Sequence, residues 1–277
     1  MCPRCHGLGY YYDCSGSSPN EQGIRLCECV TDQCRCGGEF PYTFYRDMIP
    51  ALCPCAPYRK KFNRVLLTFQ NAGIPKKYQF KFLQDFKYDH HSTLENIYKV
   101  VYTHVQDYKP GKPGKGLFLW GNTGNGKTLL SCIILNELMF SHGIKCRYMN
   151  LSFQFYNKLR DTYSEESRDY GRTYQFLQEF IDQEVLLIDD LGVQRNTEWE
   201  QEMLYNLIDR RYQEERATFI TTNQEIDTIR KLFEGRIYSR IIEMCTLIQV
   251  DAPDFRESMK LDFPRTQDKN HKNGRRK

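Results

Sequence analysis

Three short apolar runs between residues 116 and 222 end in polar residues or lead directly into them, which is typical of buried strands that reach a binding edge. They lie within Gly116–Trp120, Glu184–Asp190 and Ala217–Thr222. Runs of this length predict strands, and Leu129–Phe140, which follows the first run closely, has the spacing of a buried helix. Strands alternating with helices predict a doubly wound α/β fold around a parallel sheet, with ligands bound at the carboxyl ends of the strands.

The pattern upstream predicts helices instead. Residues 56–70 read as a basic helix, which a break with Gly and Pro at 71–75 interrupts. A second helix is expected over 92–107, and a loop of Lys, Pro and Gly follows at 109–115. These segments link the first 55 residues to the predicted sheet.

Residues 151–176 combine aromatic and basic side chains, which together can stack on bases and hold phosphates. Leu151, Phe155 and Leu159 recur at four-residue spacing, however, as on the buried face of a helix. We therefore expect most of these aromatic side chains to pack internally. The better candidates for contacts with single-stranded DNA are Lys158, Arg160 and Tyr163.

Composition favours a soluble globular protein with 40% hydrophobic and 27% charged residues among 277. No apolar run approaches the roughly 18 residues of a membrane span, and the N-terminus lacks a signal-peptide pattern. A cytoplasmic protein without a membrane partner is expected. The net charge of +4 is a property of the end of the chain, because residues 258–277 alone carry +5. That tail could scan phosphate backbones or simply be a solvated, disordered end.

Nine of the twelve cysteines lie in the first 55 residues, and eight of them form close pairs. The eight are Cys2, Cys5, Cys27, Cys29, Cys34, Cys36, Cys53 and Cys55. Short turns between cysteines deliver thiolates to a tetrahedral zinc ion, so four pairs predict two four-cysteine zinc sites. His6 or Cys14 could replace a ligand, and the spacing leaves open which pairs share a metal. A disulfide framework is the alternative, which the reducing environment of a cytosolic chain disfavours.

The charge of this cysteine-rich segment bears on its partner. Residues 1–55 carry a net charge of −2, and each zinc bound by four thiolates would formally add about −2 more. Such a module is a poor ligand for phosphate backbones, so a protein partner is expected.

The segment after the first strand matches G-x-x-x-x-G-K-[ST], the phosphate-binding loop. Its residues are Gly121, Asn122, Thr123, Gly124, Asn125, Gly126, Lys127 and Thr128. The glycines let backbone N–H groups converge on the phosphates of ATP, and the helix N-terminus adds a favourable field. Lys127 is expected to reach the β and γ phosphates, and the Thr128 hydroxyl to coordinate Mg²⁺.

Polar residues at the ends of the next two predicted strands complete a nucleotide site. Asp189 is expected to hold Mg²⁺, and Asp190 to polarise the attacking water. Asn223 follows the third strand, where it could orient that water or, alternatively, cap a helix.

From about Ala72 to Arg256 the chain resembles the DnaC/DnaI-type helicase loaders and the related IstB-like transposition ATPases. The resemblance rests on the 72–75 entry, the phosphate loop, residues 186–212, the TTN at 221–223 and the GRIYSRI at 235–241. It implies a P-loop AAA+ three-layer sandwich with a central parallel sheet, preceded by a small zinc-binding domain.

The resemblance also implies partners and further site residues. ATP sites of this kind lie between subunits of a homo-oligomer, with Arg240 matching the arginine finger best and Arg236 second. A surface salt bridge is the plain alternative for Arg240. Arg256 matches a terminal arginine that could sense nucleotide, and contact with single-stranded DNA is implied.

These observations predict four segments: a zinc-binding module at 1–60, a linker with AAA+ helices at 61–115, an ATPase core at 116–257 and a basic tail at 258–277. The expected function is ATP hydrolysis during replicative helicase loading. The alternatives are an IstB-like ATPase that assists a transposase and a nucleotide-switched adaptor with little hydrolysis.

Overall fold

The computed structural model describes residues 1–15, 23–86, 92–192 and 197–252, and its centre is a five-stranded sheet. Its strands are β5 (Gly116–Trp120), β6 (Cys146–Asn150), β7 (Val185–Asp189), β8 (Ala217–Thr222) and β9 (Cys245–Gln249). They run parallel in the order β6-β7-β8-β5-β9. The three predicted strands are confirmed as β5, β7 and β8, whereas the two edge strands were not predicted.

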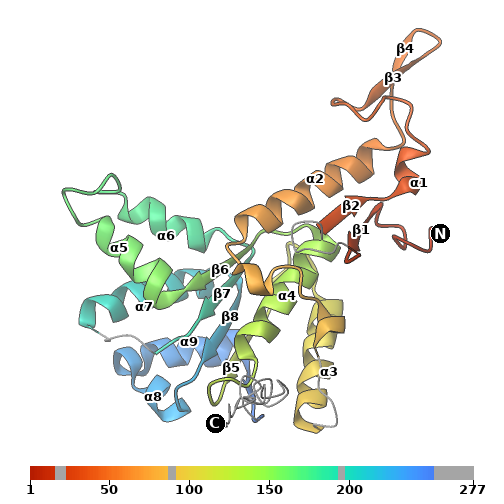
Figure 1. Cartoon of the computed structure of the whole chain (residues 1–277). Helices are drawn as coiled ribbons and strands as arrows, with labels where there is room; N and C mark the ends of the chain where they lie inside the picture. The colour runs from red at the N-terminus through yellow and green to blue at the C-terminus, as the bar shows by residue number, and fades with distance from the viewer. Residues whose placement is uncertain (16–22, 87–91, 193–196, 253–277) are drawn as a thin grey trace, which may run out of the picture.

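Helices cover both faces of this sheet (Figure 1). Leu117 and Leu119 belong to one core cluster and Phe118 to the other, because successive side chains of a strand point to opposite faces. The first cluster includes residues of α2 (Ala56–Asn71), α3 (Ser92–Asp107) and α4 (Lys127–His142). The second includes residues of α5 (Asn157–Asp161), α6 (Thr173–Ile181), α7 (Glu198–Gln213), α8 (Ile226–Arg230) and α9 (Arg236–Met244). The three-layer P-loop AAA+ sandwich is thereby confirmed.

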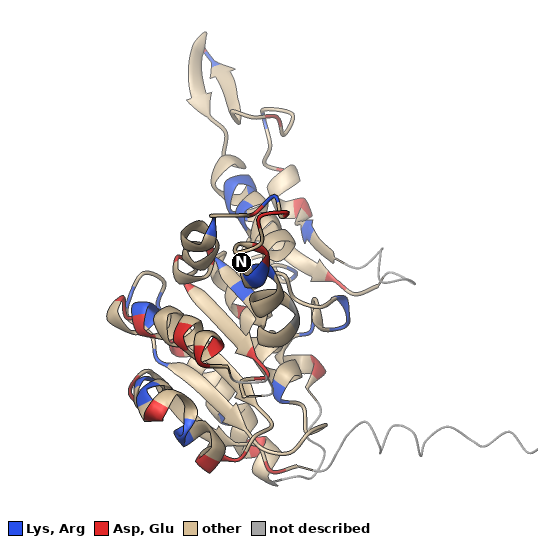
Figure 2. Ribbon diagram, turned by 90° about the vertical axis from the view of Figure 1, so that its left-hand side faces the viewer, with Lys and Arg blue, Asp and Glu red and all other residues tan. Residues whose placement is uncertain are grey.

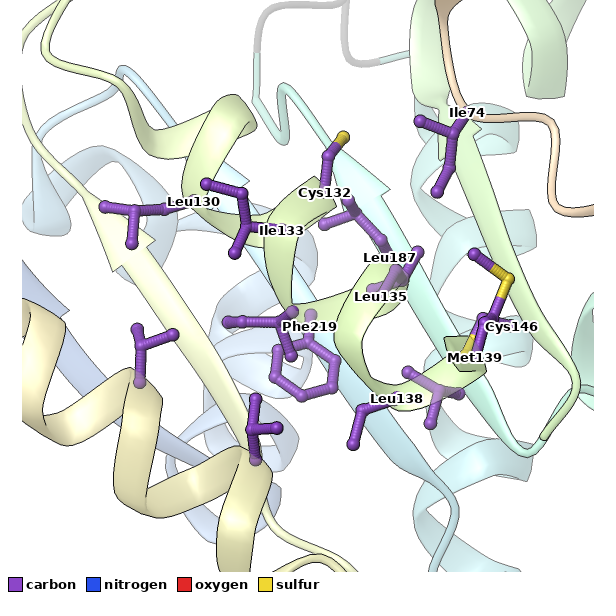
Figure 3. Packing of buried hydrophobic residues seen from close by; sticks show 14 of the residues in the cluster. Ile74, Leu130, Cys132, Ile133, Leu135, Leu138, Met139, Cys146, Leu187 and Phe219 are labelled. Carbon is purple, nitrogen blue, oxygen red and sulfur yellow. The ribbon is translucent and has the colours of Figure 1, made fainter. Parts of the chain in front are cut away.

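Helix α4 is the most deeply buried helix of the first layer. Leu130, Ile133 and Leu138 are fully buried, and Figure 3 shows its side chains beside Leu187 and Phe219 of the sheet. The helix ends at Gly143, whose φ of 65° suits the left-handed cap residue that stops many helices. The predicted buried helix is therefore confirmed, and this helix carries the phosphate loop at its N-terminus.

The segment after β6 also follows its sequence pattern. It starts as a π-helical turn, Leu151–Tyr156, and continues as α5. Leu151, Phe155 and Leu159 are all fully buried, which confirms their assignment to the core. Three short 3₁₀ turns complete the domain: Lys76–Tyr78, Leu83–Asp85 and Leu232–Gly235.

The N-terminal segment forms two small hairpins around a short helix. They are β1 (Tyr10–Asp13) with β2 (Gly23–Leu26) and β3 (Thr43–Arg46) with β4 (Ile49–Leu52), separated by α1 (Glu28–Thr31). Tyr10 and Ile24 of the first hairpin join the core cluster of the ATPase domain. Val30, Cys53 and Cys55 instead form a small cluster of their own. The segment thus has an inner half packed on the domain and an outer half that projects from it (Figure 1).

The expected division at residues 60, 115 and 257 stays a prediction. Helix α2 runs unbroken through residue 60, from the last paired cysteine into the ATPase core. Arg256 and the tail 258–277 lie outside the described residues.

Candidate nucleotide site and cysteine clusters

The loop between β5 and α4 has the backbone of an anion-binding nest. Gly121 and Gly126 hold φ values of 139° and 88°, which side chains disfavour. A Cβ atom at Gly121 would also lie 2.5 Å from the carbonyl oxygen of Val250. Glycine is therefore required where the loop passes β9, and the loop ends at the N-terminus of a 16-residue helix, where N–H groups favour phosphate.

Lys127 lies against the inner side of this loop. Its side chain is almost fully buried, and Nζ donates to the carbonyl oxygens of Gly121 and Asn122 and to Oδ1 of Asn125. Asn125 is itself fully buried and donates through Nδ2 to the carbonyl oxygen of Val250. One amide side chain therefore holds the loop lysine and fastens the loop to the end of β9.

Asp189 ends β7 and is 2% exposed. Its Oδ1 accepts from Oγ1 of Thr128 at 2.9 Å and from Oγ1 of Thr221 at 2.6 Å. Its Oδ2 accepts from the hydroxyl of Tyr148 at 2.7 Å. Burial, and then the negative charge of Asp189, raise the pKa of Tyr148, so this phenol remains a donor. The Thr128 and Asp189 oxygens are the hard ligands that Mg²⁺ prefers.

Two of these hydrogen-bond donors were missed in the sequence. Tyr148 lies on the unpredicted strand β6, and Thr221 stands two residues before the polar strand end at Asn223. Thr221 was part of the TTN at 221–223 that carries the family resemblance, but no role was predicted for its hydroxyl. Its role depends on β8 lying beside β7, which the register of parallel strands sets.

Asp190 follows directly, at the point where the chain leaves the sheet. Its φ is 62°, a left-handed conformation that Asp tolerates better than most residues. Its N–H donates to Oγ1 of Thr221, and the next N–H, of Leu191, donates to the Thr221 carbonyl. Asp189 and Asp190 are therefore both anchored by the same threonine of β8.

Asn223 follows β8 and is half-buried. Its Oδ1 accepts from Nε2 of Gln224 at 3.1 Å. The next helix, α8, has Glu225 as its N-cap, so the alternative reading of Asn223 as a helix cap is wrong. A role for Asn223 in orienting water stays a prediction.

The two arginines of α9 both contact α7. Arg240 donates through Nε to Oδ1 of Asp209 at 2.7 Å, and its guanidinium lies 4.5 Å from the ring centre of Tyr212. Arg236 is exposed and lies 4.3 Å from the ring centre of Tyr205. Within one chain, Arg240 therefore forms a salt bridge with Asp209, which is the alternative to the arginine-finger role. Neither contact tests a role toward a neighbouring subunit.

The eight paired cysteines form two clusters, which settles the pairing that the sequence left open. Cys2, Cys5, Cys27 and Cys29 form the inner cluster, and Cys34, Cys36, Cys53 and Cys55 the outer one. In each cluster all sulfur atoms lie within 4.8 Å of one another. In each cluster two pairs of sulfur atoms lie 3.6 and 3.7 Å apart. These distances are close to the roughly 3.8 Å edge of a tetrahedron with zinc–sulfur bonds of about 2.3 Å.

The chemistry of these cysteines fits a metal site better than a disulfide framework. All twelve cysteines are free. Backbone N–H groups of Cys5 and Arg4 lower the pKa of Cys2 to about 6, whereas burial raises the pKa of Cys27, so the two differ in how readily each forms the thiolate that binds metals. Cys14 is exposed, and neither it nor His6 belongs to a cluster. The remaining cysteines, Cys132, Cys146 and Cys245, are buried in the core as expected.

The candidate side chains for DNA contact are exposed on and after α5. Arg160 forms an ion pair with the buried carboxylate of Glu200, and Tyr163 packs edge-on against Trp199. Lys158 is exposed as well. In the part of the chain that the structure describes, no helix is long and apolar enough to cross a membrane.

The fold and the phosphate loop together define a P-loop ATP-binding protein of the AAA+ class. The family described as IstB-like ATP binding protein matches residues 67–262. The chain therefore belongs to the IstB-like ATP-binding protein family, and it is homologous to the DnaC and DnaI helicase loaders.

Three comparisons place it among known proteins. It is 26% identical over 216 residues to the uncharacterized protein YqaM of Bacillus subtilis (strain 168), covering 73% of this chain and 63% of YqaM. It is 25% identical over 175 residues to the replicative helicase loader DnaC of Escherichia coli (strain K12), covering 63% of this chain and 68% of DnaC. The crystal structure of the DnaC helicase loader matches with a TM-score of 0.56 at 25% identity, over 64% of this chain and all of that one. The match to YqaM thus spans less than two thirds of that relative.

Proposed function

We propose that this protein is a magnesium-dependent ATPase that loads a replicative helicase in the cytoplasm. The observation that carries the ATPase is the 2.9 Å hydrogen bond between Thr128 and Asp189, which joins the phosphate loop to the carboxylate at the end of β7. Similarity to the DnaC and DnaI loaders, together with the cysteine-rich N-terminus, supports the loading role.

The site residues divide the chemistry among them. Backbone N–H groups of residues 121–128 and the Lys127 ammonium bind the phosphates, while Thr128 and Asp189 hold Mg²⁺. Bound Mg²⁺ neutralises charge on the β and γ phosphates. Asp190 polarises the attacking water and Asn223 orients it. The hydroxyls of Tyr148 and Thr221 fix the Asp189 carboxylate and leave its charge for the metal.

The arginine finger would come from a neighbouring copy of the chain. Arg240 is the first candidate, and its salt bridge to Asp209 would have to open or turn toward the neighbour. Arg236 is exposed and forms no ion pair with the residues that the structure describes, so it stays the second candidate. ATP binding would then promote a homo-oligomer by completing the site between copies.

The two cysteine clusters would each bind one zinc ion and shape a module for a protein partner. The outer hairpin is mostly uncharged in Figure 2 and exposes Tyr45, Met48 and Ile49 at 78%, 92% and 68%. A two-stranded hairpin is marginal alone, so the adjacent metal cluster would hold this apolar surface in place. The helicase is the proposed partner, and Lys158, Arg160 and Tyr163 are the proposed contacts to single-stranded DNA.

The family match also favours a second candidate, an ATPase that assists a transposase, because the matching family is described as IstB-like. A third candidate is a nucleotide-switched adaptor with little hydrolysis, in which Asp190 is only structural.

The test is an affinity capture of wild type and the Lys127→Ala variant, with ATP and with ADP, against the replicative helicase of the same host. Capture by wild type with ATP and loss in the variant would support loading. Capture of a transposase in place of the helicase would support the IstB-type role and overturn the loader.

A further inference from the structure

A groove lies at the edge of the sheet where the strands begin. Its volume is about 610 Å³, and it is lined by residues of α3, by the loop 109–115, by Leu117 of β5 and by Thr246 of β9. The phosphate loop follows the other end of β5. The groove and the loop are therefore separated by the length of this five-residue strand, which is about 16 Å. The groove is therefore a separate surface from the nucleotide site.

Lysines dominate the lining of this groove. Lys99, Lys109, Lys112 and Lys115 line it, against Asp107 as the one carboxylate among the lining residues that the structure describes. Lys99 pairs with Glu95 on the same helix at 2.7 Å. Within the described ranges, the other three lysines are exposed and have no ion pair.

This concentration of charge is local. Residues 1–257 have a net charge of −1, so the patch stands out from a nearly neutral chain. Glu215 and Glu243 line a neighbouring hollow that Lys115 shares, and they bound the patch on that side. A groove lined by one sign of charge focuses its field and concentrates anions.

The loop presents its lysines from a defined backbone. The N–H of Lys112 donates to the carbonyl of Lys109 at 3.1 Å, and Gly111 supplies the positive φ of 73° for a tight turn. The Cβ position of Gly114 lies 3.4 Å from the side chain of Ala217, so the loop rests against the start of β8. Less conformational entropy is then lost when an anion binds.

The side-chain types narrow the class of anion. Val100 is 43% exposed and adds apolar surface to the lysine-lined groove, which suits the sugar and base edges of a polynucleotide. The basic side chains of the lining that the structure describes are all lysines apart from His104, and lysines act as point charges toward phosphates.

We infer that this lysine groove binds the phosphodiester backbone of a nucleic acid. The inference rests on the proposed function in that both bring the protein to DNA, but the groove lies apart from Lys158, Arg160 and Tyr163. It gives the protein a second nucleic-acid contact at the strand edge opposite ATP.

The test compares the full-length wild type with a variant carrying Lys109→Gln, Lys112→Gln and Lys115→Gln. Anisotropy of labelled single-stranded and duplex oligonucleotides is measured across a salt series. Three lost phosphate contacts should reduce the slope of log K against log salt by about 2 for single strands and about 2.7 for duplex. If the slope falls by the full amount with only one of the two oligonucleotides, single-stranded or duplex, that oligonucleotide is the form that the groove binds.

Two further variants sharpen the result. Replacing the same three lysines with arginine should retain binding, because the charge remains. A matched control, Lys60→Gln with Lys76→Gln and Lys145→Gln, removes the same charge from exposed positions outside the groove and should keep the slope.

An unchanged slope in the loop variant, an equal loss in the matched control or equal competition by polyglutamate would overturn the inference. So would an absence of oligonucleotide binding by wild type. Nucleotide affinity of each variant is measured in parallel and should match wild type. A variant without DNA binding but with intact ATP binding therefore bears on the groove and leaves the proposed ATPase standing.

Discussion

The hydroxyl of Tyr10 in the inner hairpin donates to the carbonyl oxygen of Phe140 in α4 at 2.6 Å, across 130 positions of sequence. Tyr10 is fully buried, and its ring packs edge-on against the Phe140 ring at 5.3 Å. Because α4 carries Lys127 and Thr128 at its other end, the inner cysteine cluster is built against the helix that holds the phosphate loop.

The first prediction concerns this hydrogen bond. Tyr10→Phe leaves the Phe140 carbonyl without its donor and should lower the free energy of unfolding by about 1–2 kcal/mol. Urea denaturation followed by circular dichroism measures the change. The control is Tyr45→Phe, which alters an exposed hydroxyl and should stay within about 0.5 kcal/mol of wild type. Equal stability of the Tyr10 and Tyr45 variants would show that the contact contributes nothing.

The second prediction separates the two metal clusters. Cys27→Ser and Cys53→Ser should each lower the zinc content from two ions to one per chain, measured by elemental analysis. The melting temperature of the ATPase domain should fall further in the Cys27 variant, because only the inner half contributes Tyr10 and Ile24 to the core. A greater fall in the Cys53 variant would contradict this division of the module.

The third prediction concerns the hydrogen bonds of Thr221 at Asp189, the proposed magnesium ligand. Thr221→Val removes the hydroxyl that donates to the Asp189 carboxylate and accepts from the Asp190 N–H. ATP turnover should fall about thirtyfold, since two hydrogen bonds are lost and each is worth about 1 kcal/mol. Asp190→Asn should cost more, about 10²-fold or above, if it positions the water. Steady-state phosphate release at saturating Mg²⁺ measures both, and full turnover in the Asp190 variant would favour the adaptor.

The fourth prediction is a pH dependence of stability. Burial lowers the pKa of His104 below its ordinary value of 6.5, and Nε2 is buried without a hydrogen-bond partner within the described residues. Between the folded pKa and 6.5 the unfolded chain binds more protons, so this residue's contribution is present above pH 6.5 and is lost as pH falls through the folded pKa. His104→Leu should flatten the dependence of unfolding free energy on pH below 6.5. Parallel curves for wild type and variant would refute the assignment.

The fifth prediction tests the apolar tip of the outer hairpin. Asp47 and Met48 form its turn with φ values of 50° and 61°, where Gly or Asn would be less strained. A variant carrying Tyr45→Ser, Met48→Ser and Ile49→Ser should capture the helicase at least tenfold more weakly than wild type, while its ATP turnover should be unchanged. Retained capture would place the partner contact elsewhere, and lost turnover would show that the tip affects the ATPase domain.

The phosphate loop and the cysteine pairs could be predicted from the sequence, because each consists of residues that are close together in the chain. The strand–loop–helix at 116–140 followed from an apolar run, glycines with positive φ and a buried helix, all contiguous. The cysteine pairs were equally local, because a short turn brings together two thiols that have one or two residues between them.

The edge strands were missed because their pattern is weak by itself. Cys146–Asn150 and Cys245–Gln249 are short and carry polar residues, and each becomes a strand by pairing along one neighbour. Pairing supplies hydrogen bonds that no local propensity predicts. The Tyr148 donor was missed for the same reason.

The sequence by itself determined the phosphate loop, the carboxylate at the end of its strand and the presence of eight cysteines in close pairs, because short-range spacing and backbone conformation specify these. Only the tertiary structure decided that cysteine pairs from residues 2–29 share one cluster, that Thr221 and Tyr148 converge on Asp189, and that Arg240 pairs with Asp209. Those contacts join segments tens of residues apart, and strand order and layer packing bring them together.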